Sequence, residues 1–292
     1  MRVYITGGTG FVGTNLVRVL TKLGHELYLY KIGESVKKSV QSFGPEIIYH
    51  LAAELRDEAK MAESNWLLTQ ELLMWTRTLD FKTFIYTGTS SEYGIKDKPM
   101  KEDMECDPTT IYAHTKWAGT LYCQLYAQLW KKNIIILRPF SLYGTDEPEY
   151  RFFPTAIKHY LENKTLNLWP GNHDWTHVDD MVTALLYFSG KELPGEIINI
   201  GTGIQTSNEE VIKLIEKIRG KKMKLNKHSE PKREGDSDTW LADTDKALSL
   251  GWVSTISLQE GLKNQIDEAV MKEIGKEVKE VRNEIKTKSR KH

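Results

Sequence analysis

The chain opens with Met1-Arg-Val-Tyr-Ile-Thr6 and continues directly into Gly7-Gly-Thr-Gly10-Phe-Val-Gly13. The first part has the pattern of a short apolar strand, and the residues after the glycines predict an amphipathic helix with a stripe of Leu16, Val17, Val19, Leu20 and Leu23. Gly7 permits a tight turn, Gly10 lets the main chain approach a pyrophosphate, and Gly13 allows the helix to pack close to the strand. Glycine turns without a ligand are common, but this combination predicts a dinucleotide-binding turn with the phosphates at the helix N-terminus.

The composition excludes several classes of protein. Forty basic and forty acidic residues among 292 leave no basic excess that would indicate nucleic-acid binding. No apolar run approaches the roughly 18 to 20 residues that span a bilayer. Met1 leads directly into a strand, which leaves no room for a signal peptide. Cys106 and Cys123 are too few for a disulfide framework, so we expect a cytoplasmic protein.

The first half of the chain alternates between strand and helix patterns. Apolar runs of strand length lie at 26–31, 46–51, 82–87 and 133–138, and helical patterns lie at 34–43, 58–79, 110–131 and 178–189. This rhythm predicts an α/β fold with a Rossmann-like, doubly wound parallel sheet. The segment before 46–51 has room for one helix but not for a further strand and helix. We therefore predict a sheet shortened on the adenine side.

The rhythm becomes irregular after residue 144, with helices expected near 151–162 and 207–219. The predicted division has a dinucleotide-binding domain, a smaller α+β substrate domain and a charged C-terminal helix. These parts comprise 1–144 with 176–202, 145–175 with 203–262, and 263–292. The terminal helix follows from apolar residues three or four apart, namely Leu262, Ile266, Val270, Ile274, Val278, Val281 and Ile285. We expect it to dock along its own subunit and fray after about 285, with an oligomerisation device as the alternative.

Tyr112 and Lys116 stand four residues apart in a predicted amphipathic helix, so their side chains project from one face. An unperturbed phenol has a pKa near 10, and a neighbouring ammonium favours the phenolate. The pair therefore has the chemistry of proton transfer, although a surface pair has the same spacing.

A second polar cluster, Thr87-Gly-Thr-Ser-Ser-Glu-Tyr-Gly94, follows the apolar run 82–87. Ligands bind beyond the carboxyl ends of strands in such sheets, and a hydroxyl there would hydrogen-bond the same substrate oxygen as the tyrosine. Ser and Thr after a strand also form ordinary turns.

Six motifs in order give the chain a resemblance to the extended short-chain dehydrogenase/reductases that act on nucleotide sugars, the epimerase, dehydratase and 4-ketoreductase family. The motifs are Gly7-x-x-Gly10-x-x-Gly13, His50-Leu-Ala-Ala53, Thr89-Ser-Ser-Glu-Tyr-Gly94, Tyr112-x-x-x-Lys116, Arg138-Pro-Phe-Ser-Leu-Tyr-Gly144 and His177-Val-Asp-Asp180. The resemblance runs from residue 1 to about 262.

The resemblance implies a catalytic set in which Tyr112 transfers the proton, Lys116 holds the nicotinamide ribose and lowers the pKa of the tyrosine, and Thr89 binds the reacting oxygen. The predicted cofactor site comprises Gly7, Gly10, Phe11, Val12, Gly13, Lys31, Leu51, Ala52, Ala53, Tyr112 and Lys116. The predicted substrate-binding residues are Ser90, Ser91 and Arg233. The guanidinium of Arg233 is suited to bind the phosphate oxygens of the sugar nucleotide.

Departures from the family pattern narrow the reaction. The 4,6-dehydratases of this family carry an Asp-Glu pair after the catalytic Thr, where this chain has Ser90 and Ser91, which argues against dehydration. We predict an NAD(P)-dependent oxidoreductase that reduces a 4-keto-hexose, because the short length is similar to that of the 4-ketoreductases. The alternatives are a nucleotide-sugar 4-epimerase with tightly bound NAD and a non-catalytic dinucleotide sensor that regulates a partner.

Lys31 stands where an acidic residue normally binds the adenosine ribose. A cation there attracts a 2′-phosphate, so we predict NADP, with NAD possible if Lys31 points to solvent. His173 and His177 have the spacing of a metal pair, but no third ligand is evident and we predict no metal. Asp179 and Asp180 precede a helix, and we expect them to cap it.

Two helices, 58–79 and 110–131, carry more apolar residues than one-sided burial requires. Members of the family pair these helices in a dimer, so we expect a homodimer through them. Burial by neighbouring elements of the same chain is the alternative.

Overall fold

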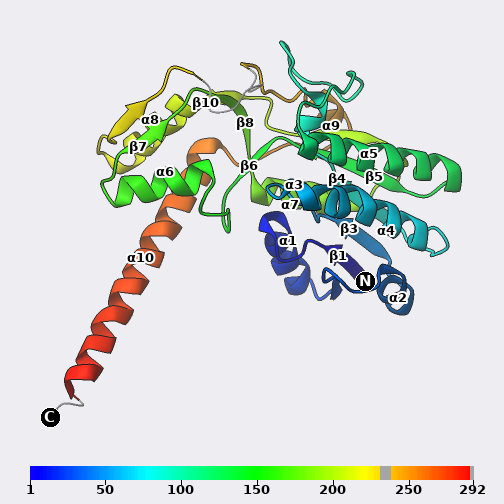
Figure 1. Ribbon diagram of the computed structural model, residues 1–292, viewed down its shortest axis with the longest axis horizontal. Helices are drawn as coiled ribbons and strands as arrows, with labels where there is room; N and C mark the ends of the chain where they lie inside the picture. The colour runs from blue at the N-terminus through cyan, green and yellow to red at the C-terminus, as the bar shows by residue number, and fades with distance from the viewer. Residues whose placement is uncertain (231–237, 290–292) are drawn as a thin grey trace.

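A six-stranded parallel sheet forms the centre of the molecule in the computed structural model, which describes residues 1–230 and 238–289 (Figure 1). Its strands, in spatial order, are β2 (Glu26–Leu29), β1 (Arg2–Thr6), β3 (Ile47–His50), β4 (Thr83–Thr87), β5 (Ile134–Pro139) and β9 (Ile197–Ile200). All neighbouring pairs are parallel. The predicted α/β class with a doubly wound sheet is confirmed.

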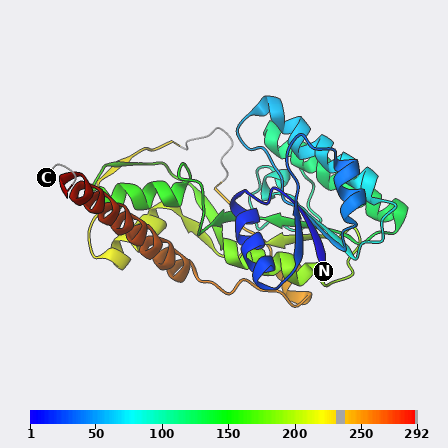
Figure 2. The ribbon, with the colours of Figure 1, turned by 90° about the horizontal axis from the view of Figure 1, so that it is seen from below.

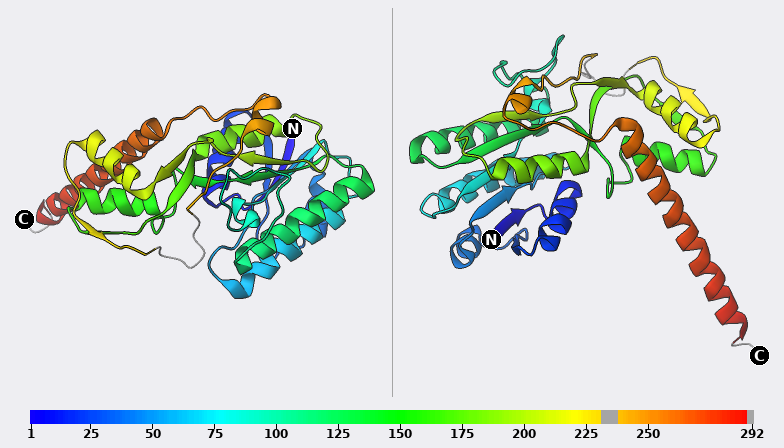
Figure 3. Two further views of the ribbon diagram at one scale, coloured as in Figure 1. Left: turned by 90° about the horizontal axis from the view of Figure 1, so that it is seen from above. Right: turned by 180° about the vertical axis from the view of Figure 1, so that it is seen from behind.

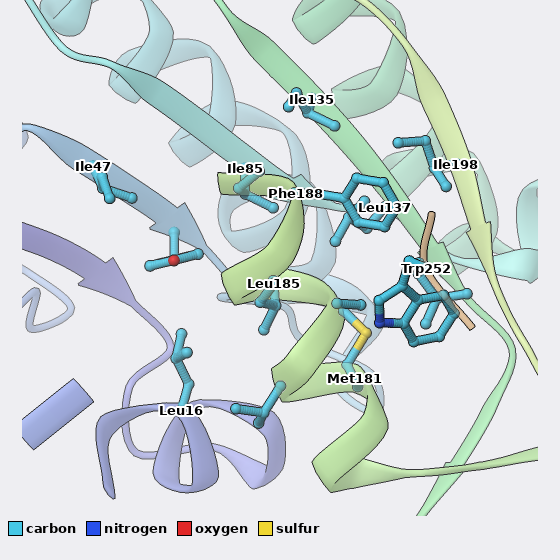
Figure 4. Packing of buried hydrophobic residues seen from close by; sticks show 14 of the residues in the cluster. Leu16, Ile47, Ile85, Ile135, Leu137, Met181, Leu185, Phe188, Ile198 and Trp252 are labelled. Carbon is cyan, nitrogen blue, oxygen red and sulfur yellow. The ribbon is translucent and has the colours of Figure 1, made fainter. Parts of the chain in front are cut away.

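Successive residues of a strand point to opposite sides of the sheet, and here both sides are apolar. Helices therefore cover both faces of this sheet. On one face α1 (Phe11–Lys22) and α7 (Val178–Ser189) pack on the sheet, and Figure 4 shows Met181, Leu185 and Phe188 of α7 against the strand residues. The other face is covered by α2 (Val36–Phe43), α4 (Leu68–Thr76) and α5 (Ile111–Trp130). The sheet is therefore the middle layer of three.

The sheet is short on the side of β2, as predicted. Only α2 connects β2 to β3, and it is eight residues long, with the Ser35 hydroxyl accepting a hydrogen bond at its start and Gly44 at φ +60 ending it. Both β2 and β3 pair with β1, so β2 is the edge strand. One short helix fits this connection, and a second strand and helix do not.

The predicted helix 58–79 is interrupted. The structure has α3 (Glu58–Met61), a π-helical segment η1 (Ala62–Leu67) and then α4. Asn65 in η1 is fully buried, where its side chain accepts a hydrogen bond from the Glu54 N–H at 2.7 Å and donates one to the Thr115 hydroxyl at 3.0 Å. These contacts to residues elsewhere in the chain accompany the wider turn, which periodicity does not reveal.

The second half forms two small sheets and a separate hydrophobic core. The first consists of β10 (Gln205–Ser207), β8 (Asn172–His177) and β6 (Ser141–Tyr143), and the second of β11 (Leu225–Lys227) and β7 (Leu166–Leu168). With α6 (Phe152–Leu161) and α8 (Asn208–Arg219) they enclose Phe153, Trp175 and Ile212. The elements α7 and β9 return to the main sheet, as expected, while α9 (Asp245–Ser249) packs beside β9. The domain boundaries stay a prediction.

The terminal helix α10 (Leu258–Ser289) docks only through its first part. Leu262 and Ile266 are buried, and the helix contacts α6, α8 and β8. Met271 is 70% exposed, and beyond it the helix projects from the body (Figures 1 and 3). The expectation that it docks along its own subunit as far as about residue 285 is therefore wrong beyond this first part. The side chains of Val278, Val281 and Ile285 lie outside the described residues.

None of the helices within 1–230 and 238–289 combines the length and the apolar character that a membrane crossing requires.

Candidate active site

The glycine turn between β1 and α1 forms a cradle. Gly7 has φ +70, and a Cβ on it would lie 2.7 Å from the main-chain nitrogen of Ala52. A Cβ on Gly13 would lie 2.7 Å from the Cα of Gly8, so only glycine lets the helix start so close to the strand. At Gly10 the nearest atom would be the Gly7 carbonyl oxygen at 3.3 Å, and the other side is open. The turn is thus tight toward the protein and free of side chains toward a ligand.

The N-terminus of α1 fits an anion. Its N-cap, Gly10, supplies no side-chain acceptor, and the first turn holds no acidic residue. The first N–H groups of a helix lack partners within it and carry a partial positive charge. A dinucleotide pyrophosphate is the ligand that such a glycine turn accepts, and the cofactor-binding roles of Phe11 and Val12 stay a prediction.

Two neighbouring segments border this turn. Leu51, Ala52 and Ala53 follow β3 and are half-buried, with Ala52 against Gly7. Lys31 follows β2 and is exposed. Its main-chain N–H donates to Glu34 Oε1 at 2.6 Å, and the Tyr28 hydroxyl donates to Glu34 Oε2 at 3.0 Å. A carboxylate therefore lies beside Lys31, which the sequence analysis did not take into account.

Thr89, Tyr112 and Lys116 meet at the carboxyl ends of β4 and β5. Tyr112 lies in the first turn of α5, whose N-cap hydroxyl on Thr110 accepts from the Ala113 N–H at 3.1 Å. The Thr89 side chain lies close enough to the Tyr112 hydroxyl to lower the pKa of the phenol. Lys116 is 2% exposed, one turn further along α5, and its ammonium lies 4.3 Å from the centre of the Tyr86 ring. The three residues predicted to be catalytic are thus brought into one site.

The pKa values of this site are governed by burial. Burial raises the pKa of Tyr112 to about 12, while the hydrogen bond from Thr89 opposes the rise. Burial lowers the pKa of Lys116 to about 8, and the Glu92 carboxylate opposes that shift. The net shift of the Tyr112 pKa is upward, opposite to the expected lowering, because desolvation of the phenolate outweighs any stabilisation of it by Lys116. At neutral pH the phenol holds its proton.

A buried ion pair beneath Thr89 fixes the turn that carries it. Glu92 and Arg138 are 0% and 1% exposed in their side chains, and Arg138 Nε donates to Glu92 Oε2 at 2.9 Å. Glu92 Oε1 accepts from the Thr89 N–H at 2.9 Å, which completes a capping box on the short 3-10 helix η2 (Ser90–Tyr93). Sequence reasoning missed this role, although Thr89-x-x-Glu92 is the spacing of a capping box.

His50 is a second structural residue of the site. Its Nδ1 lies 2.6 Å from the Thr6 hydroxyl and its Nε2 lies 2.7 Å from the Thr69 hydroxyl. Burial, assisted by the Lys116 charge, holds the pKa of His50 well below its usual value, so the ring is neutral. The ring ties β1, β3 and α4 together next to the glycine turn.

The structure places some of the other residues singled out from the sequence and leaves one outside its described part. Ser90 is buried and Ser91 half-buried in η2, directly after Thr89. Arg233 lies outside the described residues. His173 Nδ1 lies 3.0 Å from the Ser141 hydroxyl, and among the described residues no cluster suited to a metal ion occurs.

The capping prediction for Asp179 and Asp180 is wrong. His177 caps α7 instead, since its Nδ1 accepts from the Asp179 N–H at 3.2 Å. Asp180 accepts hydrogen bonds from the main-chain N–H groups of Thr255 and Ile256, so it anchors the segment that leads into α10. A carboxylate in the first turn of a helix can cap that helix or bind another segment of the chain. The contact with 254–256 shows that Asp180 does the latter.

Comparison with known proteins gives two kinds of match. The model of the NAD dependent epimerase/dehydratase family matches residues 3–201. The chain is 30% identical to an uncharacterized UDP-glucose epimerase of Bacillus subtilis, a match that covers 91% of this chain and 97% of that protein. It is 27% identical to the UDP-glucose 4-epimerase of Mycolicibacterium smegmatis, with 91% and 98% covered.

Among solved structures, the UDP-glucuronic acid 4-epimerase of Bacillus cereus, in complex with UDP-glucuronic acid and NAD, superposes with a TM-score of 0.82. It is 28% identical, and the match covers 91% of this chain and 98% of that one. The similarity therefore extends over both halves of the fold.

Proposed function

The chain belongs to the NAD-dependent epimerase/dehydratase family, and on that premise we propose that it is a nucleotide-sugar 4-epimerase with a bound nicotinamide dinucleotide. The sequence alone favours reduction of a 4-keto-hexose, with the epimerase as the alternative. The alternative now has the better support, because two of the similar proteins that match over nearly their full length are 4-epimerases by name. The observation that carries the proposal is the proximity of Thr89 to Tyr112, with the buried Lys116 one turn further along α5.

Each residue of the site has a task in such a reaction. A bound nicotinamide would supply the redox chemistry, in which C4 of the sugar first loses a hydride and later regains it. Once its own proton has passed to solvent, the Tyr112 phenolate takes the proton of the C4 hydroxyl as the carbonyl forms, and it gives that proton back when the carbonyl is reduced from the other face. Thr89 donates a hydrogen bond to the same oxygen. Lys116, one turn from the phenol, stabilises the phenolate that is formed when Tyr112 has given up its proton.

We infer that the cofactor is NAD, in place of the NADP predicted from Lys31. The Glu34 carboxylate is held beside the end of β2 by the Lys31 N–H and the Tyr28 hydroxyl. A fixed carboxylate there repels a 2′-phosphate and accepts hydrogen bonds from a ribose hydroxyl. The epimerase structure similar to this chain contains NAD.

The proposed substrate is a UDP-linked hexose or hexuronate, the class named for the similar proteins. The test is incubation of the purified protein with UDP-glucose or UDP-glucuronic acid, followed by proton NMR of the C4 position. We expect the C4 epimer without net use of added cofactor. Oxidation of added NADPH by a 4-keto sugar, with no epimer formed, would support the ketoreductase instead. Tight NAD binding with no hydride transfer would support the sensor.

We also propose a homodimer through the face shared by α4 and α5, which lie side by side (Figure 2). Own-subunit packing covers Leu72 and Cys123, but Leu121, Leu125 and Leu129 remain 47%, 46% and 60% exposed. Exposed leucines at helical spacing on one face are typical of an association surface. The cytoplasmic location stays a prediction.

A further inference from the structure

Arg151 lies between the glycine turn and Tyr112, although no motif pointed to it. It precedes α6 as its N-cap residue. The centre of its guanidinium is 5.6 Å from the centroid of the Phe11 ring, and Phe11 is the first residue of α1. Its charge also acts on Tyr112, where it lowers the pKa of the phenol against the larger effect of burial. The cation therefore lies near the start of α1 and close enough to the phenol to act on its pKa.

Part of the guanidinium is already used within the protein. Nη2 donates to the Leu142 carbonyl at 2.9 Å, and Nε lies 3.3 Å from the Glu147 carboxylate. For Nη1 the described residues provide no hydrogen-bond acceptor, and the side chain is 30% exposed. An arginine held by two of its nitrogens has a fixed direction and keeps donors for a ligand.

The segment that precedes Arg151 is anchored on two sides. On α1, the Asn15 amide donates to the Thr145 carbonyl at 2.9 Å, and Arg18 pairs with Asp146. On α10, the Gln265 amide donates to the Gly144 carbonyl at 3.1 Å. Figures 1 and 3 show this segment, between β6 and α6, running beside α1. Arg151 is thus held at a fixed position relative to the glycine turn.

We propose that Arg151 binds the pyrophosphate of the dinucleotide, as a side-chain partner added to the main-chain N–H groups of α1. The pyrophosphate carries two negative charges, and the turn itself offers only neutral donors. A guanidinium that reaches this place supplies a charge-assisted hydrogen bond, which is about twice as strong as a neutral one. This inference rests on the proposed function only to the extent that the glycine turn binds a dinucleotide.

The test compares Arg151→Gln with the wild-type protein by displacement of a fluorescent etheno-NAD. The competing ligands are NAD, ADP-ribose and AMP, of which AMP lacks the pyrophosphate. We expect the affinities for NAD and for ADP-ribose to fall about tenfold to a hundredfold and that for AMP to stay unchanged. Arg151→Lys keeps the charge and should lose less. Lys158→Gln, which removes an exposed cation further along α6, is the matched control and should bind all three ligands normally.

Unchanged binding of NAD and ADP-ribose to Arg151→Gln would overturn the proposal. This holds also if the KM of the variant for the nucleotide sugar rises, because Arg151 would then act on the sugar substrate and not on the dinucleotide. An equal loss for AMP would also overturn it, because the effect would then be a general distortion. If Arg151→Gln does not fold, Arg151→Lys decides by the same comparison. No sugar is present in the binding assay, so its result can be interpreted even if the epimerase proposal fails.

Discussion

At the scale of single residues, Tyr112 carries the proposed chemistry, and its environment favours the protonated phenol. The pKa raised to about 12 means that proton release needs the Lys116 ammonium and the Thr89 hydroxyl close by. We expect Tyr112→Phe to lower the turnover about a hundredfold to ten-thousandfold, because a general acid or base contributes that much. The rate of epimer formation measures it, with NAD binding as the control that should not change. Full activity of this variant would remove Tyr112 from the mechanism.

Glu147 makes stability depend on pH. Burial raises its pKa to about 7, although Arg151 and Gln265 oppose the rise. The ordinary value is near 4.5, so the folded protein holds this proton more tightly than the unfolded chain, and the stability it contributes is lost as the pH rises through about 7. In urea titrations at pH 5 and pH 8, the wild type should lose up to about 3 kcal/mol of unfolding free energy from this group. Glu147→Gln should remove that part of the slope, and an identical slope would contradict the assignment.

Glu34 should decide between the two dinucleotides. Because its carboxylate is held at the end of β2, Glu34→Gln removes the repulsion toward a 2′-phosphate and leaves Lys31 as the dominant charge. We expect the ratio of NADP to NAD affinity to rise about tenfold, the size of one charged interaction. Titration of both nucleotides checks this. Glu26→Gln, an exposed carboxylate at the start of the same strand, is the control and should leave the ratio alone.

At the scale of helices and strands, local patterns were sufficient for most of the fold. Strand runs such as 82–87 and 133–138 and the helix at 178–189 were found where predicted, because burial on both sides of a parallel sheet leaves continuous apolar runs. The η1 interruption was not predictable, since it depends on contacts of Asn65 with Glu54 and Thr115.

In the candidate site, too, some residues follow from local patterns and others depend on contacts far apart in the chain. Thr89, Tyr112 and Lys116 were predicted from motifs, because a strand end and one helical turn determine where they lie. The direction of the Tyr112 pKa shift was predicted wrongly, since burial depends on the whole fold. Arg151 was missed because its position depends on a segment anchored to α1 and α10.

The exposed leucines of α5 test the proposed dimer. Leu125→Glu places a charge in the middle of the face formed by Leu121, Leu125 and Leu129, and burying an unpaired carboxylate is strongly unfavourable. We expect sedimentation velocity to report a dimer for the wild type and a monomer for this variant. Leu248→Glu, at a site 60% exposed on α9, is the control and should stay dimeric. A monomeric wild type, or a variant that remains dimeric, would rule out this interface.

At the scale of the whole molecule, the site lies where the two halves of the chain meet. The sheet and α5 supply the glycine turn, Thr89 and Tyr112, while the segment after β6 brings Arg151 near the first residue of α1 and also contacts α10. The first part of α10 packs on the second core, and Asp180 anchors the segment that leads into it. The C-terminal helix is thereby connected through hydrogen bonds to α1, which follows the glycine turn.

The most direct test of the central claim is the fate of the hydrogen on C4. The purified protein is incubated in ordinary water with a UDP-hexose or UDP-hexuronate that carries deuterium at C4, and the product is analysed by NMR and mass spectrometry. A 4-epimerase that takes and returns the hydride within one site predicts the C4 epimer with the deuterium still on C4. An epimer that has lost the deuterium to solvent, or no epimer with any UDP-hexose or UDP-hexuronate, would contradict the account.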